Sequence, residues 1–277
     1  DRLRSRGLGD VYKRQTDNSL EVASSFQDER IHIYTKENEG VSAARNYGIM
    51  HAKYDYIAFL DADDIWESDY LECQKKLIGT YPDAGIYSTA FYSLEKGKRK
   101  LRNVLINEHI HFLVHDYFKE SVMNGLSICW TSSLCLKKEV IKEIPMFRVG
   151  IKRGEDLDLW LRIALNYDVA YLNLPKVFYR TGLSDSLTSD YSKNGEFPYY
   201  EWFNFTSESS YYRKYVILVV YIHAKNAFIH HDYDTCLAEL WSVKTIAWRF
   251  KWAEPVSYTH LRAHETVAYL VCRLLLE

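Results

Sequence analysis

The chain has 277 residues, of which 47% are hydrophobic and 26% are charged, and its formal net charge is −2. These values are ordinary for a globular protein, and the balanced charge gives no overall field of the kind that attracts nucleic acid. The five cysteines form no Cys-x-x-Cys pair, which argues against a zinc site or disulfide framework, and the longest apolar run, residues 215–222, is too short to span a bilayer.

The two ends of the chain resemble translations of one DNA element. Codons chosen for residues 5–15 give a string whose reverse complement, in a shifted frame, encodes residues 256–265. The element resembles a transposon-type sequencing adapter, and residues 271–277 resemble further adapter sequence. We therefore expect residues 1–15 and 256–277 to be non-native, and we exclude them from fold reasoning.

Between these ends, strand patterns alternate with helix patterns, which predicts an α/β layer architecture. The expected strands cover residues 31–34, 56–60, 85–91, 131–136, 169–172 and 177–179. The expected helices cover residues 20–26, 41–52, 68–81, 116–124, 138–143 and 155–165, followed by two longer ones over 200–230 and 232–250. The basic stretch 97–108 is expected to be an exposed loop or hairpin. Strand 56–60 is apolar on both faces and is predicted to be central.

An apolar run ends abruptly in three carboxylates, Asp61, Asp63 and Asp64. A buried strand that releases acidic groups at its carboxyl end can present a hard metal ion to a ligand. Mg²⁺ and Mn²⁺ prefer such oxygen ligands and often accompany a phosphorylated substrate. The alternative is an acidic turn that caps the next helix, a role that Asp64 would fill, with Ser68 also at a capping position.

Two further blocks carry polar groups at helix starts, residues 38–48 and 154–162. In the first, Gly40 permits a tight turn and Arg45 offers a fork of donors for a phosphate or a carboxylate. In the second, Glu155 and Asp156 open a helix, where the macrodipole favours anions. The alternatives are a helix start with a salt bridge for the first block and helix capping for the second.

In this order and spacing, the three blocks resemble the family 2 glycosyltransferases of the GT-A fold over about residues 16–189. The resemblance implies a Rossmann-like mixed sheet flanked by helices, whose first strands are missing from this chain, plus a C-terminal helical appendage. We expect a catalytic domain at 16–195 and a helical region at 196–255. Because the missing strands would hold part of the nucleotide pocket, we expect the 277-residue chain to be poorly stable and largely inactive.

The resemblance implies inverting transfer from a nucleotide-diphospho-sugar, expected to be a UDP-sugar, to a hydroxyl of a bacterial surface glycan or glycolipid. Asp156 would be the general base, with Glu155 beside it, and Asp63 and Asp61 would bind Mg²⁺ or Mn²⁺ and the diphosphate. The implied donor-binding residues are Asn38, Gly40, Arg45, Asn46, Asp61 and Asp63. Trp160 and Arg180 would lie on the acceptor side, although Trp160 could equally belong to the core. The His that family members often use as a third metal ligand has no counterpart between residues 179 and 189.

The expected partners are therefore a nucleotide-sugar and a glycan or lipid-linked acceptor, with no nucleic acid. The expected location is the cytoplasm, at the inner face of the membrane. Basic and tryptophan residues of the C-terminal helices could touch lipid headgroups, or these helices could simply cap the catalytic domain. Two other function classes remain open: a non-catalytic sugar-nucleotide or glycan-binding module, and a metal-dependent nucleotidyltransferase that releases pyrophosphate.

Overall fold

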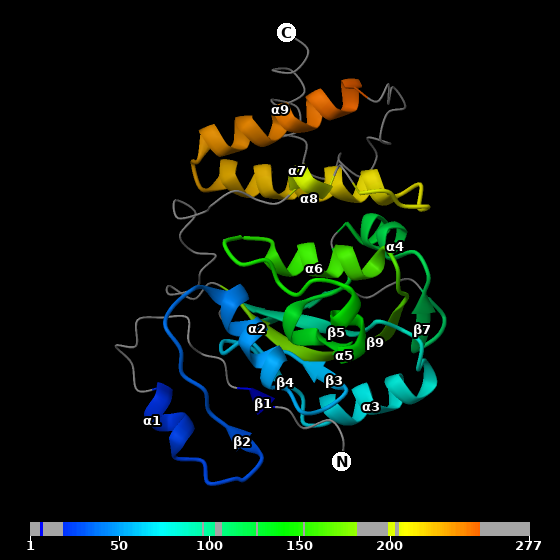
Figure 1. The fold of residues 1–277 in the computed structure, drawn as a ribbon. Coiled ribbons are helices and arrows are strands. Elements are labelled where there is room, and N and C mark those ends of the chain that lie inside the picture. Colours follow the sequence, from blue (N-terminus) through cyan, green and yellow to red (C-terminus); the bar gives the residue numbers. More distant parts are fainter. Residues whose placement is uncertain are drawn as a thin grey trace. The chain divides into compact units, whose positions relative to one another are not determined.

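The structure is a computed structural model that describes residues 6–7, 19–95, 97–102, 107–125, 127–151, 153–181, 199–202 and 205–249 (Figure 1). The chain divides into two compact units, Asp1–Ser209 and Ser210–Glu277. The domain boundary predicted between residues 195 and 196 lies outside the described residues.

A mixed sheet of seven strands forms the centre of the first unit. Its main path is β3-β8-β5-β9-β4, while β6 pairs with β5 and β7 pairs with β9. β5 and β9 are parallel to each other, and the other pairs in this sheet are antiparallel. The strands are β3 (Tyr56–Ala58), β4 (Ile65–Trp66), β5 (Ile86–Glu95), β6 (Lys98–Arg102), β7 (His111–Val114), β8 (Leu134–Lys137) and β9 (Val169–Arg180). The predicted mixed α/β architecture is confirmed.

The prediction that strand 56–60 is central is wrong for the described residues. There, β3 lies at one end of the strand order and pairs with β8 alone. Ile57 is only 4% exposed on one face of β3, and Tyr56 and Ala58 on the other face are partly buried, so both faces of the strand are at least partly covered. An apolar pattern on both faces reports that both faces are covered, and it carries no information about pairing at the edges.

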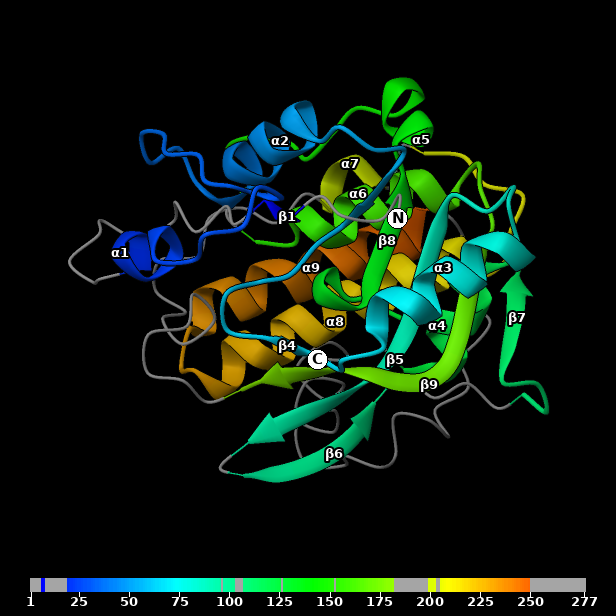
Figure 2. The ribbon, with the colours of Figure 1, turned by 90° about the horizontal axis from the view of Figure 1, so that it is seen from below.

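Strand β9 joins two segments that the sequence pattern predicted as separate strands, 169–172 and 177–179. Pro175 lies where the pairing of β9 with β5 shifts register, next to Ala90. Proline has no N–H for the ladder and is tolerated at such irregularities. Strand β7, which pairs with the first half of β9, was not predicted. The basic stretch forms a hairpin in which β6 pairs with β5 (Figure 2).

Helices cover both faces of the sheet, with α6 and α3 on opposite sides (Figure 1). The helices of this unit are α1 (Ser19–Ser24), α2 (Val41–His51), α3 (Tyr70–Thr80), α4 (Tyr117–Asn124), the 3₁₀ turn η1 (Thr131–Ser133), α5 (Lys138–Glu143), α6 (Glu155–Ala164) and α7 (Tyr199–Trp202). Leu77 of α3 packs against Tyr87 and Cys135 of the sheet. The predicted Ser68 cap is wrong, because Asp69 holds the N-cap position of α3 and makes no side-chain cap bond.

A two-residue parallel pair joins β1 (Arg6–Gly7), in the segment expected to be non-native, to β2 (Ile31–His32). The second unit contains α8 (Tyr212–Ile229) and α9 (Tyr233–Arg249). Helix α9 agrees with the prediction of 232–250, whereas the helix predicted over 200–230 begins only at Tyr212, because residues 205–211 are not helical. Buried His223 of α8 and Glu239 of α9 share a hydrogen bond inside this unit. Among the helices that the structure describes, none is both long and apolar enough to cross a membrane.

Candidate functional site

Arg45 joins the three sequence blocks at one place. Its Nη1 donates to Oε1 of Glu155 at 2.8 Å, and its Nη2 donates to Oδ1 of Asp61 at 2.8 Å. The guanidinium is mostly buried, with 13% of the side chain exposed. Residues that are 16 and 110 positions away from Arg45 in sequence therefore meet on its fork. The fork binds carboxylates, as the salt-bridge alternative predicted, and both of its arms are occupied.

The charges around Arg45 are dominated by carboxylates. Burial lowers the pKa of Arg45, but Asp61, Glu155 and Asp156 outweigh burial and raise the pKa overall. Burial also raises the pKa of Glu155 to about 7, with Asp156 adding to the rise and Arg45 opposing it. One guanidinium facing three carboxylates leaves an excess of negative charge, which is an environment that favours a bound cation.

Asn38 and Gly40 shape the turn that leads into α2. The Oδ1 of Asn38 accepts a hydrogen bond from the N–H of Gly40 at 3.1 Å. Gly40 holds the N-cap position of α2 with φ at +90°, a conformation that suits glycine. The turn fixes where α2 begins and hence where Arg45 points. Any contact of these two residues with a donor stays a prediction.

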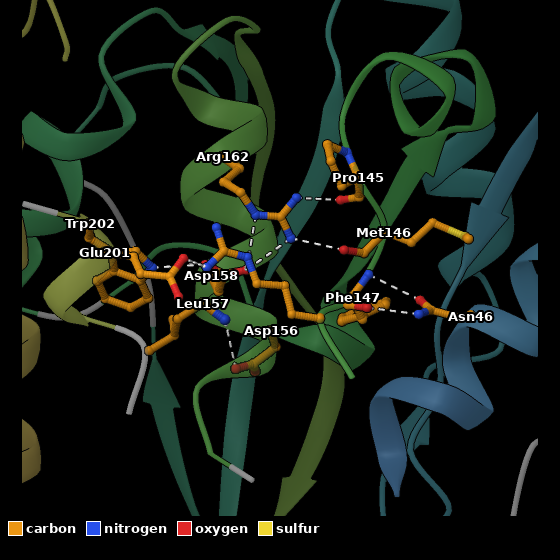
Figure 3. A network of polar contacts seen from close by, with 11 residues as sticks. Asn46, Pro145, Met146, Phe147, Asp156, Leu157, Asp158, Arg162, Glu201 and Trp202 are labelled. Carbon is orange, nitrogen blue, oxygen red and sulfur yellow. Dashed lines mark hydrogen bonds and ion pairs between the residues drawn. The ribbon is translucent and has the colours of Figure 1, made fainter. Parts of the chain in front are cut away.

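Asn46 ties α2 to the segment before α6. Its Nδ2 donates to the carbonyl of Phe147 at 2.7 Å, and its Oδ1 accepts from the N–H of Phe147 at 3.0 Å (Figure 3). The ring centroid of Phe147 then lies 5.3 Å from the Cζ atom of Arg45. The amide of Asn46 is thus used to position Phe147 beneath Arg45, a role that its motif did not reveal.

The acidic turn is fastened to the end of β9. Oδ1 of Asp64 accepts from the backbone N–H of Arg180 at 3.2 Å, and Nε of Arg180 donates to the carbonyl of Asp63. The hydroxyl of Ser132 accepts from the N–H of Asp61 at 3.0 Å. The prediction that Asp64 caps the following helix is therefore wrong. Arg180 braces this turn through its backbone and its guanidinium, whereas its predicted place on the acceptor side stays a prediction.

Tyr179 is a member of the site to which sequence reasoning assigned no role of its own. Burial raises the pKa of its hydroxyl above the ordinary value, and Asp64, Asp63, Asp156 and Asp61 raise it further. These four carboxylates thus surround one phenol. The ring of Trp130 lies with its centroid 4.6 Å from that of Tyr179. The signal available in the sequence was the position of Tyr179 next to Arg180, at the end of a strand.

Asp156 begins α6 with its carboxylate held in place. Its Oδ2 accepts from the hydroxyl of Thr131 at 3.2 Å, and its Oδ1 accepts from the N–H of Leu157 at 2.7 Å. Gly154 precedes the helix in the left-handed conformation, with φ at +74°. Because Glu155 turns to Arg45 and Asp156 turns to Thr131, the two adjacent acids have different surroundings. Asp156 is half-buried and remains partly accessible to solvent.

The acids at 61 and 63 were predicted to hold a metal ion. The described residues contain no group of three or more His, Cys, Asp or Glu arranged to hold one. Within the same residues, the carboxylate of Asp63 takes part in no hydrogen bond or ion pair, and Asp61 binds Arg45 through Oδ1. Magnesium usually takes one or two protein carboxylates and completes its shell with water and substrate phosphates. The residues present fit that kind of site, with Asp63 as the protein ligand.

Trp160 lies in the core, in agreement with the alternative that its helical position left open. Its side chain is 0% exposed. Its ring centroid lies 6.2 Å from that of Phe59 and 5.7 Å from that of Phe147. A side chain without exposed surface supports the strand end and Phe147 from behind, and it does not line an acceptor pocket directly.

A buried carboxylate, Asp158, organises the back of α6 (Figure 3). It is 0% exposed and accepts from Nε of Arg162 at 2.9 Å and from Nε1 of Trp202 at 2.8 Å. Arg162 donates onward to the carbonyl of Pro145 and, at 3.0 Å, to that of Met146. The network fixes the segment that ends at Phe147, and so it supports Arg45 indirectly. Sequence reasoning assigned no role to Asp158.

Asp64 makes stability depend on pH. Burial raises its pKa from 3.8 to about 7, against opposing effects of Ser132 and the N–H of Arg180. The folded chain therefore holds a proton that the unfolded chain releases between about pH 4 and 7, so stability falls as pH rises through this window. Asp64→Asn removes this loss. We expect the variant to gain roughly 2–3 kcal/mol on the wild type between pH 5 and pH 8.

Urea denaturation of both proteins at the two pH values measures this gain. Glu155, whose pKa shifts in the same direction, is present in both proteins and its contribution cancels in the comparison. An unchanged stability difference between wild type and variant at the two pH values would contradict the raised pKa of Asp64.

Comparisons with known proteins match this chain to glycosyltransferases. Residues 14–144 match the family model described as Glycosyl transferase family 2. An uncharacterized glycosyltransferase of Rickettsia felis is 34% identical over 154 residues, which are 54% of this chain and 24% of that protein. The Bacillus subtilis glycosyltransferase TuaG, named for teichuronic acid biosynthesis, is 29% identical over 159 residues, 56% of this chain and 59% of TuaG. The chain thus spans less than two thirds of the length of these relatives.

Among solved structures, S. aureus TarS residues 1–349 in complex with UDP-GlcNAc matches with a TM-score of 0.53 and 13% sequence identity. The match covers 88% of this chain and 66% of that one. At this identity the likeness shows the fold, which is a GT-A type mixed sheet with flanking helices.

Proposed function

Since the matches support membership of glycosyl transferase family 2, we propose that this site transfers a sugar from a nucleotide-diphospho-sugar to an acceptor hydroxyl, with inversion at the anomeric carbon. The observation that carries the proposal is the fork of Arg45. It brings Asp61 of the second block and Glu155 of the third to the same guanidinium. Among the described residues, the carboxylates of Asp63 and Asp156 accept from no arginine.

The donor is proposed to be a UDP-sugar. The TarS structure, which has the same fold, is a complex with UDP-GlcNAc, and this supports a donor of the same class here. Asp63, with Asp61 beside it, would hold Mg²⁺ or Mn²⁺. When bound, the ion supplies charge neutralisation for the diphosphate that leaves. Asn38 and Gly40 would shape the loop on the donor side.

Asp156 is proposed to act as the general base. Its carboxylate takes the proton of the acceptor hydroxyl while that oxygen attacks the anomeric carbon, and the bond to the nucleoside diphosphate breaks. Thr131 holds one carboxylate oxygen at 3.2 Å and so fixes the side chain for this step. Glu155 is tied to Arg45 and positions the guanidinium. One displacement with a single carboxylate base inverts the configuration, unlike a two-step retaining route.

The acceptor is proposed to be a bacterial surface glycan or its lipid-linked precursor, at the inner face of the cytoplasmic membrane. The name of TuaG supports an acceptor of the cell-surface polysaccharide class. Because residues 16–255 are expected to derive from a longer protein, the experiments below use the parent gene product. This term denotes the protein encoded by the intact gene that contains residues 16–255.

Removal of the metal ion tests the proposal. We expect the parent gene product to release nucleoside diphosphate from one member of a panel of UDP- and dTDP-sugars when Mn²⁺ and acceptor are present. Chelation with EDTA should reduce the rate by roughly a hundredfold or more, because charge on the leaving diphosphate is then uncompensated. Restoring Mn²⁺ should restore the rate. Release at full rate in EDTA would contradict the metal site, and release of pyrophosphate would indicate a nucleotidyltransferase.

A further inference from the structure

Three basic residues of β6 stand on the same face of the sheet as Tyr179. Strand pairing places Lys100 opposite Ser93 of β5, and Ser93 opposite Tyr179 of β9. Residues paired across neighbouring strands point to one face of the sheet. Tyr179 lies next to the site, because Arg180, the residue that follows it, binds Asp64 and Asp63. Lys100 therefore lies two strands away from the site, roughly 10 Å from Tyr179 between backbones.

The alternation along β6 adds two further cations to this face. Successive residues of a strand point to opposite faces, so Lys98 and Arg102 share the face of Lys100. Nε of Arg102 donates to the hydroxyl of Ser93 at 3.1 Å, which agrees with this placement. Lys98 and Lys100 are exposed to solvent. We call Lys98, Lys100 and Arg102 the basic strip.

The residues between them occupy the opposite face. Cζ of Arg99 lies 4.8 Å from the centroid of the Phe178 ring. That ring stacks on Tyr92, at an interplanar angle of 18°. Neither ring belongs to the group around Tyr179. Arg99 thus carries the same charge as the strip on a face turned away from the site, and it provides a matched control.

We propose that the basic strip binds the acceptor, and that the acceptor is an anionic polymer with carboxylate or phosphate groups along its chain. The inference rests on the proposed function for the location of the acceptor and adds its charge. Neighbouring members of the strip are about 7 Å apart along the strand, a spacing that suits repeated charges on an extended chain. The strip is two strands from Tyr179, and Arg180, the next residue of β9, binds the turn that carries Asp63 and Asp64.

Lysines on an edge strand can also serve to prevent edge-to-edge aggregation. That role needs charge on the strand and is indifferent to the face on which the charge lies. Anion binding beside the site requires charge on the Tyr179 face alone. The face dependence of polymer binding therefore separates the two interpretations.

The test measures binding of fluorescein-labelled polygalacturonate to the parent gene product by fluorescence anisotropy, with labelled dextran of equal length as the neutral comparison. No donor is present. We expect Lys98→Gln/Lys100→Gln to weaken polygalacturonate binding about tenfold at low salt, with a shallower salt dependence, because fewer counterions are released. Arg99→Gln and the charge-matched pair Lys75→Gln/Lys119→Gln, on exposed positions of α3 and α4, should change binding less than twofold.

Equal binding by Lys98→Gln/Lys100→Gln and wild type would overturn the proposal, as would equal losses in both double variants. Vesicles of equimolar phosphatidylglycerol and phosphatidylcholine form the other arm. Loss of vesicle binding in Lys98→Gln/Lys100→Gln with unchanged polymer binding would assign the strip to a membrane surface and also overturn it. Far-UV circular dichroism and thermal melting confirm that each variant is folded. Because binding is measured without turnover, an absence of sugar transfer would refute the proposed function separately.

Discussion

Asp158→Ala is expected to destabilise the protein by roughly 3–5 kcal/mol, since it leaves a buried guanidinium without its counter-ion. Asp158 is 0% exposed and accepts hydrogen bonds from both Arg162 and Trp202. Nε of Arg148 lies 3.4 Å from its Oδ2. Burial lowers the pKa of Arg162 against the opposing effect of Asp158, which shows that the cation depends on this carboxylate. Urea denaturation of the parent gene product, followed by far-UV circular dichroism, measures the change.

The matched control is Asp168→Ala, which removes a carboxylate from an exposed pair. Asp168 accepts from Nδ1 of His115 at 2.8 Å, and the histidine side chain is 75% exposed. Exposed pairs contribute about 1 kcal/mol at most, so this variant should stay close to wild type. Similar losses in the two variants would contradict the role of Asp158 as the organiser of α6. A further variant, Asp158→Asn, keeps an acceptor for Trp202 and should lose less than Asp158→Ala.

The largest expected effect on activity comes from Asp156→Asn. The amide keeps the shape of the side chain and can still accept from Thr131, but it cannot take a proton from an acceptor hydroxyl. Loss of a general base typically lowers the rate by roughly 10²–10⁴-fold, so we expect kcat to fall by this factor. The KM for the donor should change little, because the proposed site of the diphosphate is at Asp63 and not at Asp156. Steady-state kinetics of sugar transfer by both proteins measure the two constants.

Thr131→Val serves as a graded comparison for Asp156→Asn. It removes the hydroxyl that holds Oδ2 of Asp156 at 3.2 Å and leaves the carboxylate itself in place. A smaller fall in kcat than that of Asp156→Asn is expected. If Asp156→Asn kept wild-type kcat while remaining folded, the general base would have to be another group, and Glu155, with its pKa raised by burial to about 7, would be the next candidate.

The sequence predicted the parts of this site that depend on local pattern. Helices α2 and α6 begin where Gly40 and the Glu155–Asp156 pair indicated, and the acids of the second block follow a buried strand. That the three blocks serve one site was implied by their resemblance to the family 2 glycosyltransferases. Local pattern is informative here because helix starts and strand ends are set by a few neighbouring residues.

The parts that were missed depend on partners distant in sequence. Asn46 binds Phe147, which is 101 positions away and belongs to none of the three blocks. The sequence predicted that the guanidinium of Arg45 would donate hydrogen bonds to a phosphate or a carboxylate. Only the fold shows that it binds the carboxylates of Asp61 and Glu155. Asp158 and Arg162 are four residues apart on α6, a spacing typical of an ion pair on one helical face, and this signal could have been used. The basic stretch was predicted to be an exposed loop or hairpin, but the face on which each basic residue lies follows from the pairing of β6 with β5.

One assay tests most directly the proposal that the residues around Arg45 form a sugar-transfer site. It measures nucleoside diphosphate released from a panel of UDP- and dTDP-sugars by the parent gene product with Mn²⁺, compared between wild type and Asp156→Asn. We expect acceptor-dependent release from one donor by the wild type and its near-complete loss in the folded variant. Absence of release from every donor by a folded wild type would refute the proposal, and would favour a non-catalytic sugar-nucleotide or glycan-binding module.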